Sequence, residues 1–338
     1  MFRSKKFQRS VMPLIIANSI FCTGLLEYFV DRTIRTIGFF YIIFCSTYYS
    51  TLYFKLKDVM NVLLGFKETK VAEIITKFTF VYNVIVYVIA IFAGLLRRKR
   101  IKLFVRQLEI CTIGIDEMTV SRNNHSLFRY QCVASVILFF IASGLIAIDI
   151  FWTFKTNCPY NLKIWFYFYD NYPLIVTMII DFTFAFWIRY IKIKFSQLNA
   201  VLQSMLTTTI DSPQHKRVFR MKDNWEDDSS LSIIYRTYKT NENIVKLKKV
   251  KQIHLELTKC AGIINEAYGL QILISISTSV IHITTLLYNL YVISITNEYD
   301  HWIKQLFAHV YWICFFVIKI IAVNNICERT IREVCYTF

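Results

Sequence analysis

The sequence predicts an all-α protein, a polytopic transmembrane helical bundle with long cytoplasmic helix extensions. Hydrophobic residues make up 55% of the 338 positions and charged residues only 18%. The hydrophobic residues gather into seven runs of 18 residues or more instead of alternating with polar ones. At a rise of about 1.5 Å per residue, each run is long enough as a helix to cross a hydrocarbon layer of roughly 30 Å. Lysine and arginine are also unevenly divided among the connections, as expected for loops on two sides of a membrane.

The seven runs mostly lack the polar stripe that a soluble amphipathic helix shows on its outer face. A soluble fold would have to bury all of them completely, together with most of the 29 Phe and 21 Tyr residues. Helices are the expected form in lipid because they satisfy their own backbone hydrogen bonds. In chain order, the runs are residues 10–30, 37–54, 77–96, 130–153, 165–188, 267–293 and 302–324.

The basic residues indicate which connections face the cytoplasm. Of the 39 Lys and Arg residues, 8 lie in 97–129 and 14 in 189–266, but only 2 lie in 154–164 and none in 294–301. By the positive-inside rule, loops 97–129 and 189–266 are cytoplasmic, and residues 325–338 lie on the same side. The net charge of +16 is therefore a topology signal with a generic attraction to membrane lipid, and no nucleic-acid partner is expected.

The first run leaves two topologies open. If residues 10–30 cross the membrane, there are seven spans and the N-terminus is outside. If they lie in the interface or re-enter, there are six spans and both ends are inside. The six-span arrangement places more Lys and Arg in the cytoplasm, and Pro13, Asn18 and Glu27 make this run the least suited of the set to span the membrane. The expected organisation is an N-terminal cytoplasmic and membrane-associated segment (1–36), a helical bundle (37–324) and a cytoplasmic tail (325–338).

Two helices are expected to continue below the membrane. From about Asn243 to Leu257, apolar side chains recur at three- and four-residue spacing, and the pattern continues into the next apolar run. One helix of about 50 residues would therefore begin in the cytoplasm and end at the outer surface. His254 belongs to this apolar stripe and is expected to be structural. Residues 195–206 extend the preceding helix similarly, whereas 210–230 is expected to be a mobile connection.

The sequence shows no pattern of an enzyme or of a metalloprotein. The 9 cysteines form no Cys-x-x-Cys pair and no histidine stands at metal-ligand spacing, so no metal or other cofactor is expected. The motifs of serine hydrolases, zinc peptidases, dinucleotide-binding folds and P-loops are absent. A glycosylation sequon begins at Asn124, but both topologies place it inside, so it is expected to be unused.

Three segments resemble insect gustatory receptors. His254–Leu257 followed by Ile263–Gln271 resembles the stretch where these receptors enter their fifth helix. Ile115–Met118, at the end of the second helix's cytoplasmic extension, and Cys327–Glu333, after the sixth helix, agree with it in order and spacing. The resemblance covers essentially the whole chain, from about Pro13 to Glu333. It tends toward the fructose-receptor and broadly tuned 28-type branches of the family.

This resemblance implies a gustatory (taste) chemoreceptor in the plasma membrane of chemosensory neurons. It would be a ligand-gated, non-selective cation channel, a homo- or hetero-tetramer with intracellular N-termini. A small-molecule tastant, such as a sugar or a bitter compound, would bind in the outer half of each bundle. In the family, a seventh helix with a Thr-Tyr and a Gln-Phe lines the pore. Only fourteen residues follow Asn324, several of them charged, so no such helix can be built from them. We therefore expect an incomplete form with a truncated tail that does not conduct alone.

The outer halves of the runs combine aromatic side chains with a few hydrogen-bonding groups, as a pocket for a sugar or a small organic ligand requires. In the alternative interpretation, Tyr and Trp form the interfacial belt, and Asn and Thr hold helices together. The ligand-binding candidates are Asp149, Tyr288, Asn289, Gln305 and Trp312.

Two charges lie within the apolar runs. Asp181 is eight residues before Arg189, and Lys319 is five before Asn324. Both helices end inside, so the two charges lie at similar depth. Because an unpaired ion in hydrocarbon is costly, Asp181 and Lys319 are hypothesised to form an intramembrane ion pair. Alternatively, Lys319 extends to the interface and Asp181 meets water.

A seven-helix G-protein-coupled receptor is the alternative function, with residues 10–30 as its first span. The details disagree, because the third run ends in Leu96-Arg-Arg-Lys-Arg100 instead of Asp-Arg-Tyr, and the last run lacks Asn-Pro-x-x-Tyr. No cysteine near 66–80 is available to pair with Cys158. A secondary transporter is a weaker alternative, because no Gly- or Pro-interrupted helices recur at repeated positions. The position of the N-terminus distinguishes a gustatory receptor, in which it is inside the cell, from a G-protein-coupled receptor, in which it is outside.

Overall fold

Every element that the structure describes is an α-helix, which confirms the predicted all-α fold class. The structure is a computed structural model, and the residues it describes are 5–21, 32–64, 70–118, 125–153, 160–208, 229–296 and 302–335. The helices are α1 (Lys5–Ile20), α3 (Arg32–Leu64), α4 (Lys70–Met118), α5 (His125–Thr153), α6 (Tyr160–Thr208), α8 (Ser229–Thr296) and α9 (Trp302–Cys335). Within these residues, α4, α5, α6, α8 and α9 are long and apolar enough to cross a membrane. The fold is that of a multi-pass membrane bundle.

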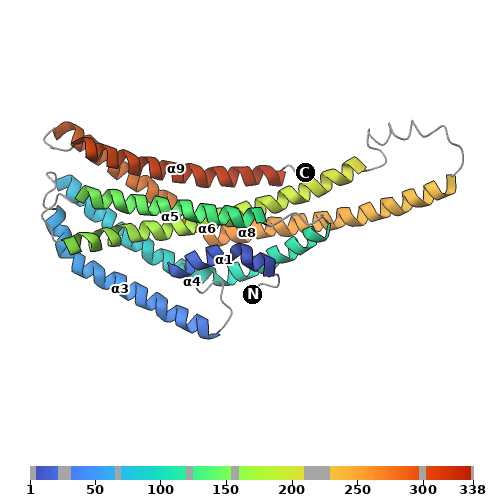
Figure 1. Cartoon of the computed structure of the whole chain (residues 1–338), viewed down its shortest axis with the longest axis horizontal. Helices are drawn as coiled ribbons and strands as arrows, with labels where there is room; N and C mark the ends of the chain where they lie inside the picture. The colour runs from blue at the N-terminus through green and yellow to red at the C-terminus, as the bar shows by residue number, and fades with distance from the viewer. Residues whose placement is uncertain are drawn as a thin grey trace.

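The helices lie side by side along the long axis of the molecule, and from α3 onward their directions alternate (Figure 1). Contacts between α4 and α8 fix their antiparallel alignment. Near one end, the Lys249 ammonium lies 2.7 Å from the Glu117 carboxylate. Farther along, the Gln271 amide donates to the carbonyl of Ala90 at 3.1 Å. Helices α4, α6 and α9 end, and α8 begins, at the same end of the bundle (Figure 1), which is the end predicted to be cytoplasmic.

Helix α1 stands outside this alternation. It runs from the basic end of the bundle toward the opposite end, and α3 runs in the same direction (Figure 1). Its 16 residues span about 24 Å, less than the ~30 Å of a hydrocarbon layer. The Asn18 amide holds α1 against α6 by donating to Thr183 Oγ1 at 2.8 Å, and the Tyr41 hydroxyl of α3 donates to the Ile20 carbonyl at 3.1 Å. The described part of this helix is therefore too short to cross the membrane by itself. The six-span topology stays a prediction, because residues 22–31 of the first run lie outside the described residues.

Helices α8 and α9 extend farther on the predicted cytoplasmic side than the sequence indicated. Helix α8 has 68 residues and begins at Ser229, whereas the apolar pattern placed its start near Asn243. The added residues contain no Gly or Pro, so the helix continues although its apolar repeat has ended. Helix α9 likewise continues through most of the expected tail to Cys335. The expected mobile connection, 210–230, lies almost entirely outside the described residues.

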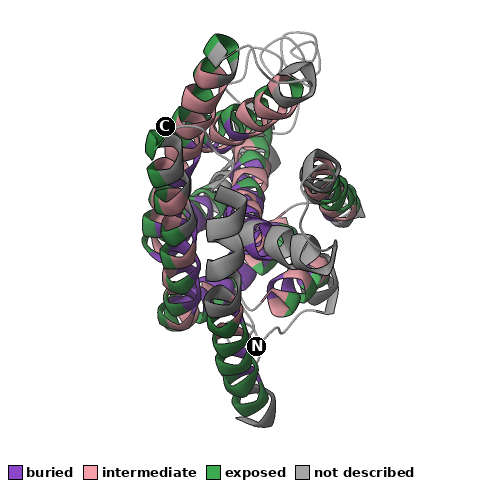
Figure 2. Ribbon diagram, turned by 90° about the vertical axis from the view of Figure 1, so that its left-hand side faces the viewer, coloured by how far each residue is buried: buried purple, intermediate pink, exposed green. Residues whose placement is uncertain are grey.

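The buried core follows α4, α6 and α8 at the centre of the bundle (Figure 2). In α6, 72% of the apolar 18-residue stretch that could cross the membrane is buried inside the chain. The corresponding share is 7% in α5 and 11% in α9. Trp187 of α6 is fully buried and meets Phe104 of α4 edge to face, with ring centroids 5.0 Å apart. Helices α5 and α9 instead expose apolar side chains such as Phe139 and Phe307, as lipid-facing helices do. Helix α6 is therefore the central helix on which the other helices pack.

Candidate functional site

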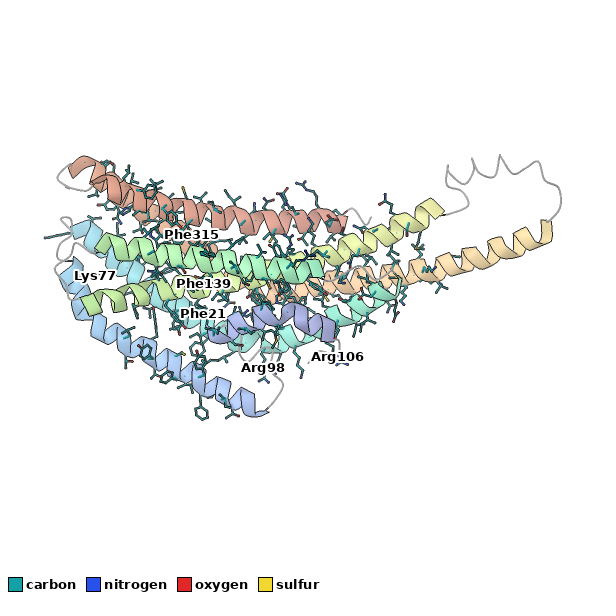
Figure 3. All side chains as sticks on the ribbon, in the orientation of Figure 1. Phe21, Lys77, Arg98, Arg106, Phe139 and Phe315 are labelled. Atoms are coloured by element: carbon teal, nitrogen blue, oxygen red, sulfur yellow. The ribbon has the colours of Figure 1, made fainter. Side chains whose placement is uncertain are left out.

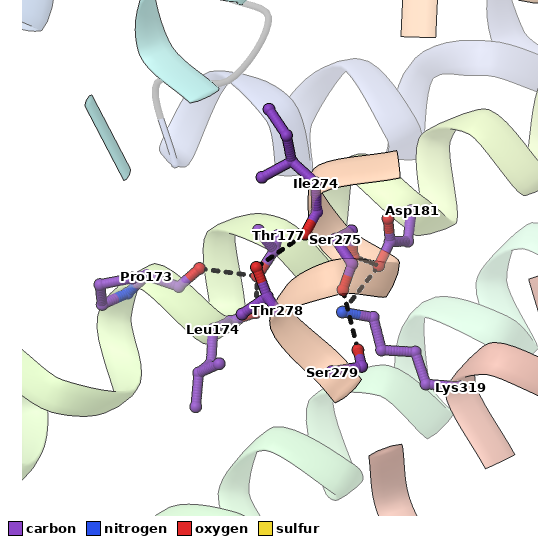
Figure 4. Close-up of polar contacts among 9 residues, drawn as sticks. All are labelled: Pro173, Leu174, Thr177, Asp181, Ile274, Ser275, Thr278, Ser279 and Lys319. Carbon is purple, nitrogen blue, oxygen red and sulfur yellow. Dashed lines mark hydrogen bonds and ion pairs between the residues drawn. The ribbon is translucent and has the colours of Figure 1, made fainter. Parts of the chain in front are cut away.

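Three polar side chains from three helices meet inside the bundle (Figure 4). Asp181 comes from α6, Ser275 from α8 and Lys319 from α9. The Lys319 ammonium lies 2.9 Å from Asp181 Oδ2, and the Ser275 hydroxyl donates to the same oxygen at 2.6 Å. The side chain of Asp181 is 8% exposed and that of Lys319 is 11% exposed. The structure thus brings together the two charges for which the sequence suggested pairing.

The pair links a peripheral helix to the central one. An isolated charge in a low-dielectric interior is costly, and an opposite charge with a further hydrogen bond offsets most of that cost. Most of the apolar window of α9 faces outward, yet Lys319 turns inward to Asp181. The pair is therefore one of the contacts that hold α9 against α6.

A small cavity adjoins Asp181 between α4, α6 and α8. Its free volume is about 10 Å³, close to the space that one water molecule needs. Asp181 Oδ1 and Gln271 Oε1 line it, are buried, and have no hydrogen-bond partner among the described residues. Pockets for small organic ligands measure several hundred Å³. This cavity suits a single water-sized group and is too small for a sugar or a bitter compound.

The hydroxyl groups around the pair are used within their own helices (Figure 4). Thr177 Oγ1 donates to the Pro173 carbonyl at 2.8 Å, and Thr278 Oγ1 donates to that of Ile274 at 2.7 Å. Ser279 Oγ donates to the Ser275 carbonyl at 2.9 Å. Small hydroxyl side chains of this kind let membrane helices approach closely. Their small size therefore allows α6 and α8 to pack closely beside the ion pair.

An aromatic group lies one to two helical turns from Lys319, on the side away from the cytoplasmic end. The His282 ring of α8 stacks on Phe316 of α9, with centroids 4.9 Å apart and planes 8° apart. Trp312 stacks on the same Phe316 at 5.7 Å. His282 Nε2 lies 3.2 Å from Asn83 Oδ1 of α4. We call His282, Trp312, Phe316 and Asn83 the outer aromatic group.

The five predicted ligand residues lie on α5, α8 and α9, and their grouping into one pocket stays a prediction. Trp312 belongs to the outer aromatic group. Tyr288 and Asn289 lie half-buried on α8, about two turns beyond His282. Asp149 and Gln305 lie on described helical backbone, in α5 and α9, but their side chains are outside the described residues.

A comparison with protein families identifies the class of this bundle. The profile of the 7tm chemosensory receptor family matches residues 11–338. The chain belongs to this family. It is therefore a chemosensory receptor with a multi-pass membrane fold, which points to reception rather than enzymatic catalysis. No curated protein gives a significant match to it.

A tyrosine cluster in this receptor was not predicted from the sequence. Tyr49 of α3 stacks on Tyr169 of α6, with ring centroids 4.3 Å apart and planes 10° apart. Tyr87 of α4 lies 4.4 Å from Tyr49, and Tyr172 meets Tyr87 edge to face at 5.4 Å. Which tyrosines face inward depends on the rotation of each helix, and apolar composition does not encode that rotation.

The receptor also has a buried polar contact below the predicted membrane runs. Lys194 of α6 is 2% exposed and lies 3.8 Å from Asp116 Oδ1 of α4, and its ammonium donates to Gln197 Oε1 at 3.1 Å. Burial lowers the pKa of Lys194, and Asp116 opposes this shift. His254 is buried with its ring 5.2 Å from Phe195, and burial lowers its pKa as well. These contacts join the cytoplasmic extensions of α4, α6 and α8.

Proposed function

We propose that this chemosensory receptor is a gustatory receptor, a subunit of a ligand-gated, non-selective cation channel in the plasma membrane of chemosensory neurons. Its ligand would be a small organic tastant such as a sugar or a bitter compound. The observation that carries the proposal is the family match over residues 11–338, together with the resemblance of three ordered segments to gustatory receptors. The shared direction of α1 and α3 supports an intracellular N-terminus, in contrast to a G-protein-coupled receptor.

The proposed ligand site lies in the outer halves of α5, α8 and α9, at Asp149, Tyr288, Asn289, Gln305 and Trp312. The outer aromatic group supports this location, because it offers a stacked aromatic surface beside the polar groups of His282 and Asn83. Aromatic faces with few, well-placed hydrogen-bonding groups are characteristic of sites for small ligands. Trp312 is the residue on which the proposal depends most, since it belongs to both sets.

The proposed assembly is a homo- or hetero-tetramer of such subunits. Its support comes from apolar side chains on the cytoplasmic extensions, where no lipid is expected to cover them. In α4, Leu103, Ile110 and Ile113 are 49%, 56% and 42% exposed. In α8, Val245 and Leu247 are 66% and 50% exposed. Apolar surface exposed to water favours burial against another protein surface.

The test is a ligand screen on the purified full chain in detergent, read by the shift of its thermal unfolding midpoint. A bound ligand stabilises the folded state by mass action, so a recognised sugar or bitter compound is expected to raise the midpoint. Trp312→Ala is expected to weaken that ligand about tenfold, through the loss of one stacked aromatic contact. Trp312→Phe, which keeps a stacked ring, is expected to preserve most of the affinity.

Phe307→Ala is the matched control, because Phe307 lies on the same helix and is 70% exposed. This variant is expected to keep the full ligand-induced shift. A panel of sugars and bitter compounds without any stabilising member would contradict tastant binding. An equal loss of the ligand-induced shift in Trp312→Ala and Phe307→Ala would contradict the proposed location of the ligand site.

A further inference from the structure

The cytoplasmic end of the membrane part of α4 carries a dense group of basic residues. Six of the ten residues from Arg97 to Arg106 are Lys or Arg. They follow directly on the apolar run 77–96, so the first of them lie at the level of the inner-leaflet headgroups. Clusters of four to eight basic residues immediately cytoplasmic of a membrane helix are typical of anionic-lipid binding. The sequence alone does not show which of the six are available.

The structure separates the six into two sets. Arg97 is 3% exposed, and its guanidinium lies 4.3 Å from the centre of the Tyr268 ring. Arg100 donates to the Glu266 carbonyl at 2.8 Å, and its Nε lies 3.9 Å from the Glu266 carboxylate. These two arginines are therefore used to hold α4 against α8.

The other four face away from the bundle: Arg98, Lys99, Lys102 and Arg106. Arg98 is partly exposed and the other three are exposed. None of the four forms an ion pair with a carboxylate whose side chain the structure describes. Figure 3 shows Arg98 and Arg106 on the same outer side of α4, at the end of the bundle opposite Lys77. We call these four residues the α4 basic face.

The spacing of the α4 basic face indicates the size of its ligand. Arg98, Lys102 and Arg106 follow one another at four-residue intervals, so they form one row about 12 Å long on the helix. Leu96 and Leu103 beside this row are 81% and 49% exposed. An anion that neutralises the whole row must carry several charges over about the same length, and its apolar part must continue toward the membrane.

We propose that the α4 basic face binds an inner-leaflet phospholipid whose headgroup carries more than one phosphate. The row begins at the headgroup level and extends into the cytoplasm, so it outreaches the single phosphate of a common anionic lipid and fits a phosphorylated inositol ring. Leu96, at the membrane end of the row, contacts the acyl chains of the same lipid. The inference concerns lipid recognition and does not depend on which tastant the receptor senses.

The experiment is native mass spectrometry of the purified full chain, titrated with a phosphatidylinositol bisphosphate and, separately, with phosphatidylserine. The wild-type chain is expected to bind the bisphosphate lipid at least about tenfold more tightly than phosphatidylserine. The triple variant Arg98→Gln, Lys102→Gln, Arg106→Gln is expected to lose at least about tenfold in affinity for the bisphosphate lipid.

Two further variants make the result specific. Lys248→Gln, Lys251→Gln, Arg329→Gln removes the same charge from exposed positions on α8 and α9 and is expected to bind as the wild type does. Arg98→Lys, Arg106→Lys keeps the charge of the row and is expected to stay within about threefold of the wild type. Unchanged binding in the first triple variant, or an equal loss in the control triple variant, would overturn the proposal. Equal affinity for phosphatidylserine would overturn the assignment of a multiply phosphorylated headgroup.

Discussion

At the scale of single residues, the Asp181–Lys319 pair has the clearest energetic consequence. Its carboxylate accepts from an ammonium and from the Ser275 hydroxyl, and both charges are almost fully removed from solvent. Removing one partner of such a pair leaves a buried, uncompensated charge, whereas replacing both partners is far less harmful. The depth of both residues could be predicted by counting from the helix ends. Their facing orientation could not, because it depends on the rotation of α6 and α9.

We predict that Asp181→Asn and Lys319→Met each destabilise the receptor by about 3 kcal/mol, because each leaves one buried charge unpaired. The double variant is expected to recover most of that loss. Thermal unfolding of the purified variants measures the coupling between the two positions.

Lys192→Gln serves as the control for this cycle. Lys192 pairs with Glu333 at 3.8 Å, with side chains 31% and 29% exposed. A more exposed pair is expected to contribute at most about 1 kcal/mol. Purely additive effects of Asp181→Asn and Lys319→Met would show that the two residues do not stabilise each other.

At the scale of elements, the continuity of α8 distinguishes the structure from the sequence-based expectation. The apolar repeat could predict a helix from Asn243 into the membrane, because packing against α4 and α6 requires that repeat. It could not predict the helix from Ser229, because residues outside the packed region carry no periodic signal. The tyrosine cluster was not predicted for a related reason. Composition identifies an apolar membrane helix, but it does not show which face of that helix points into the bundle.

Two helical glycines give a matched test of packing along α4 and α8. A Cβ added at Gly262 of α8 meets no heavy atom within 4 Å, whereas one at Gly114 of α4 meets Ile253 Cδ1 at 3.0 Å. We predict that Gly262→Ala raises stability by about 0.5 to 1 kcal/mol, because alanine loses less backbone entropy in a helix.

Gly114→Ala is expected to gain less than Gly262→Ala or to lose stability, because Ile253 must move to admit the methyl group. The unfolding midpoints of the two variants, measured under the same conditions, decide the comparison. A larger gain at Gly114 than at Gly262 would show that α4 and α8 are packed differently at Ile253.

At the scale of the whole molecule, charge and hydropathy could predict most of the arrangement. Long apolar runs fix the helical class because lipid requires internally satisfied backbones, and the basic loops distinguish the two ends of the bundle. What they could not give is the convergence of α6, α8 and α9 on one buried carboxylate. The first run also remained ambiguous, and the contacts of Asn18 with Thr183 and of Tyr41 with Ile20 clarify how its helix packs.

We predict that an epitope tag on the N-terminus is detected only in permeabilised cells, because α1 and α3 both start at the end of the bundle that is predicted to be cytoplasmic. For the same topology, glycosidase treatment is expected to leave the electrophoretic mobility unchanged, since the sequon at Asn124 is predicted to be cytoplasmic. A tag accessible in intact cells would instead support the G-protein-coupled arrangement, and a glycan at Asn124 would reverse the assignment of both basic loops.

Because α8 is one helix of 68 residues, it can act as a rigid lever about 100 Å long. The contacts of Arg97 with Tyr268 and of Arg100 with Glu266 hold α8 against α4 where α8 is predicted to leave the membrane. They are therefore placed to act as the fulcrum about which α8 tilts. From there to Ser229 the arm measures about 60 Å. A tilt of about 3° at the fulcrum would displace the far end by about 3 Å. A small rearrangement beside His282 would therefore be amplified deep in the cytoplasm without any joint in between.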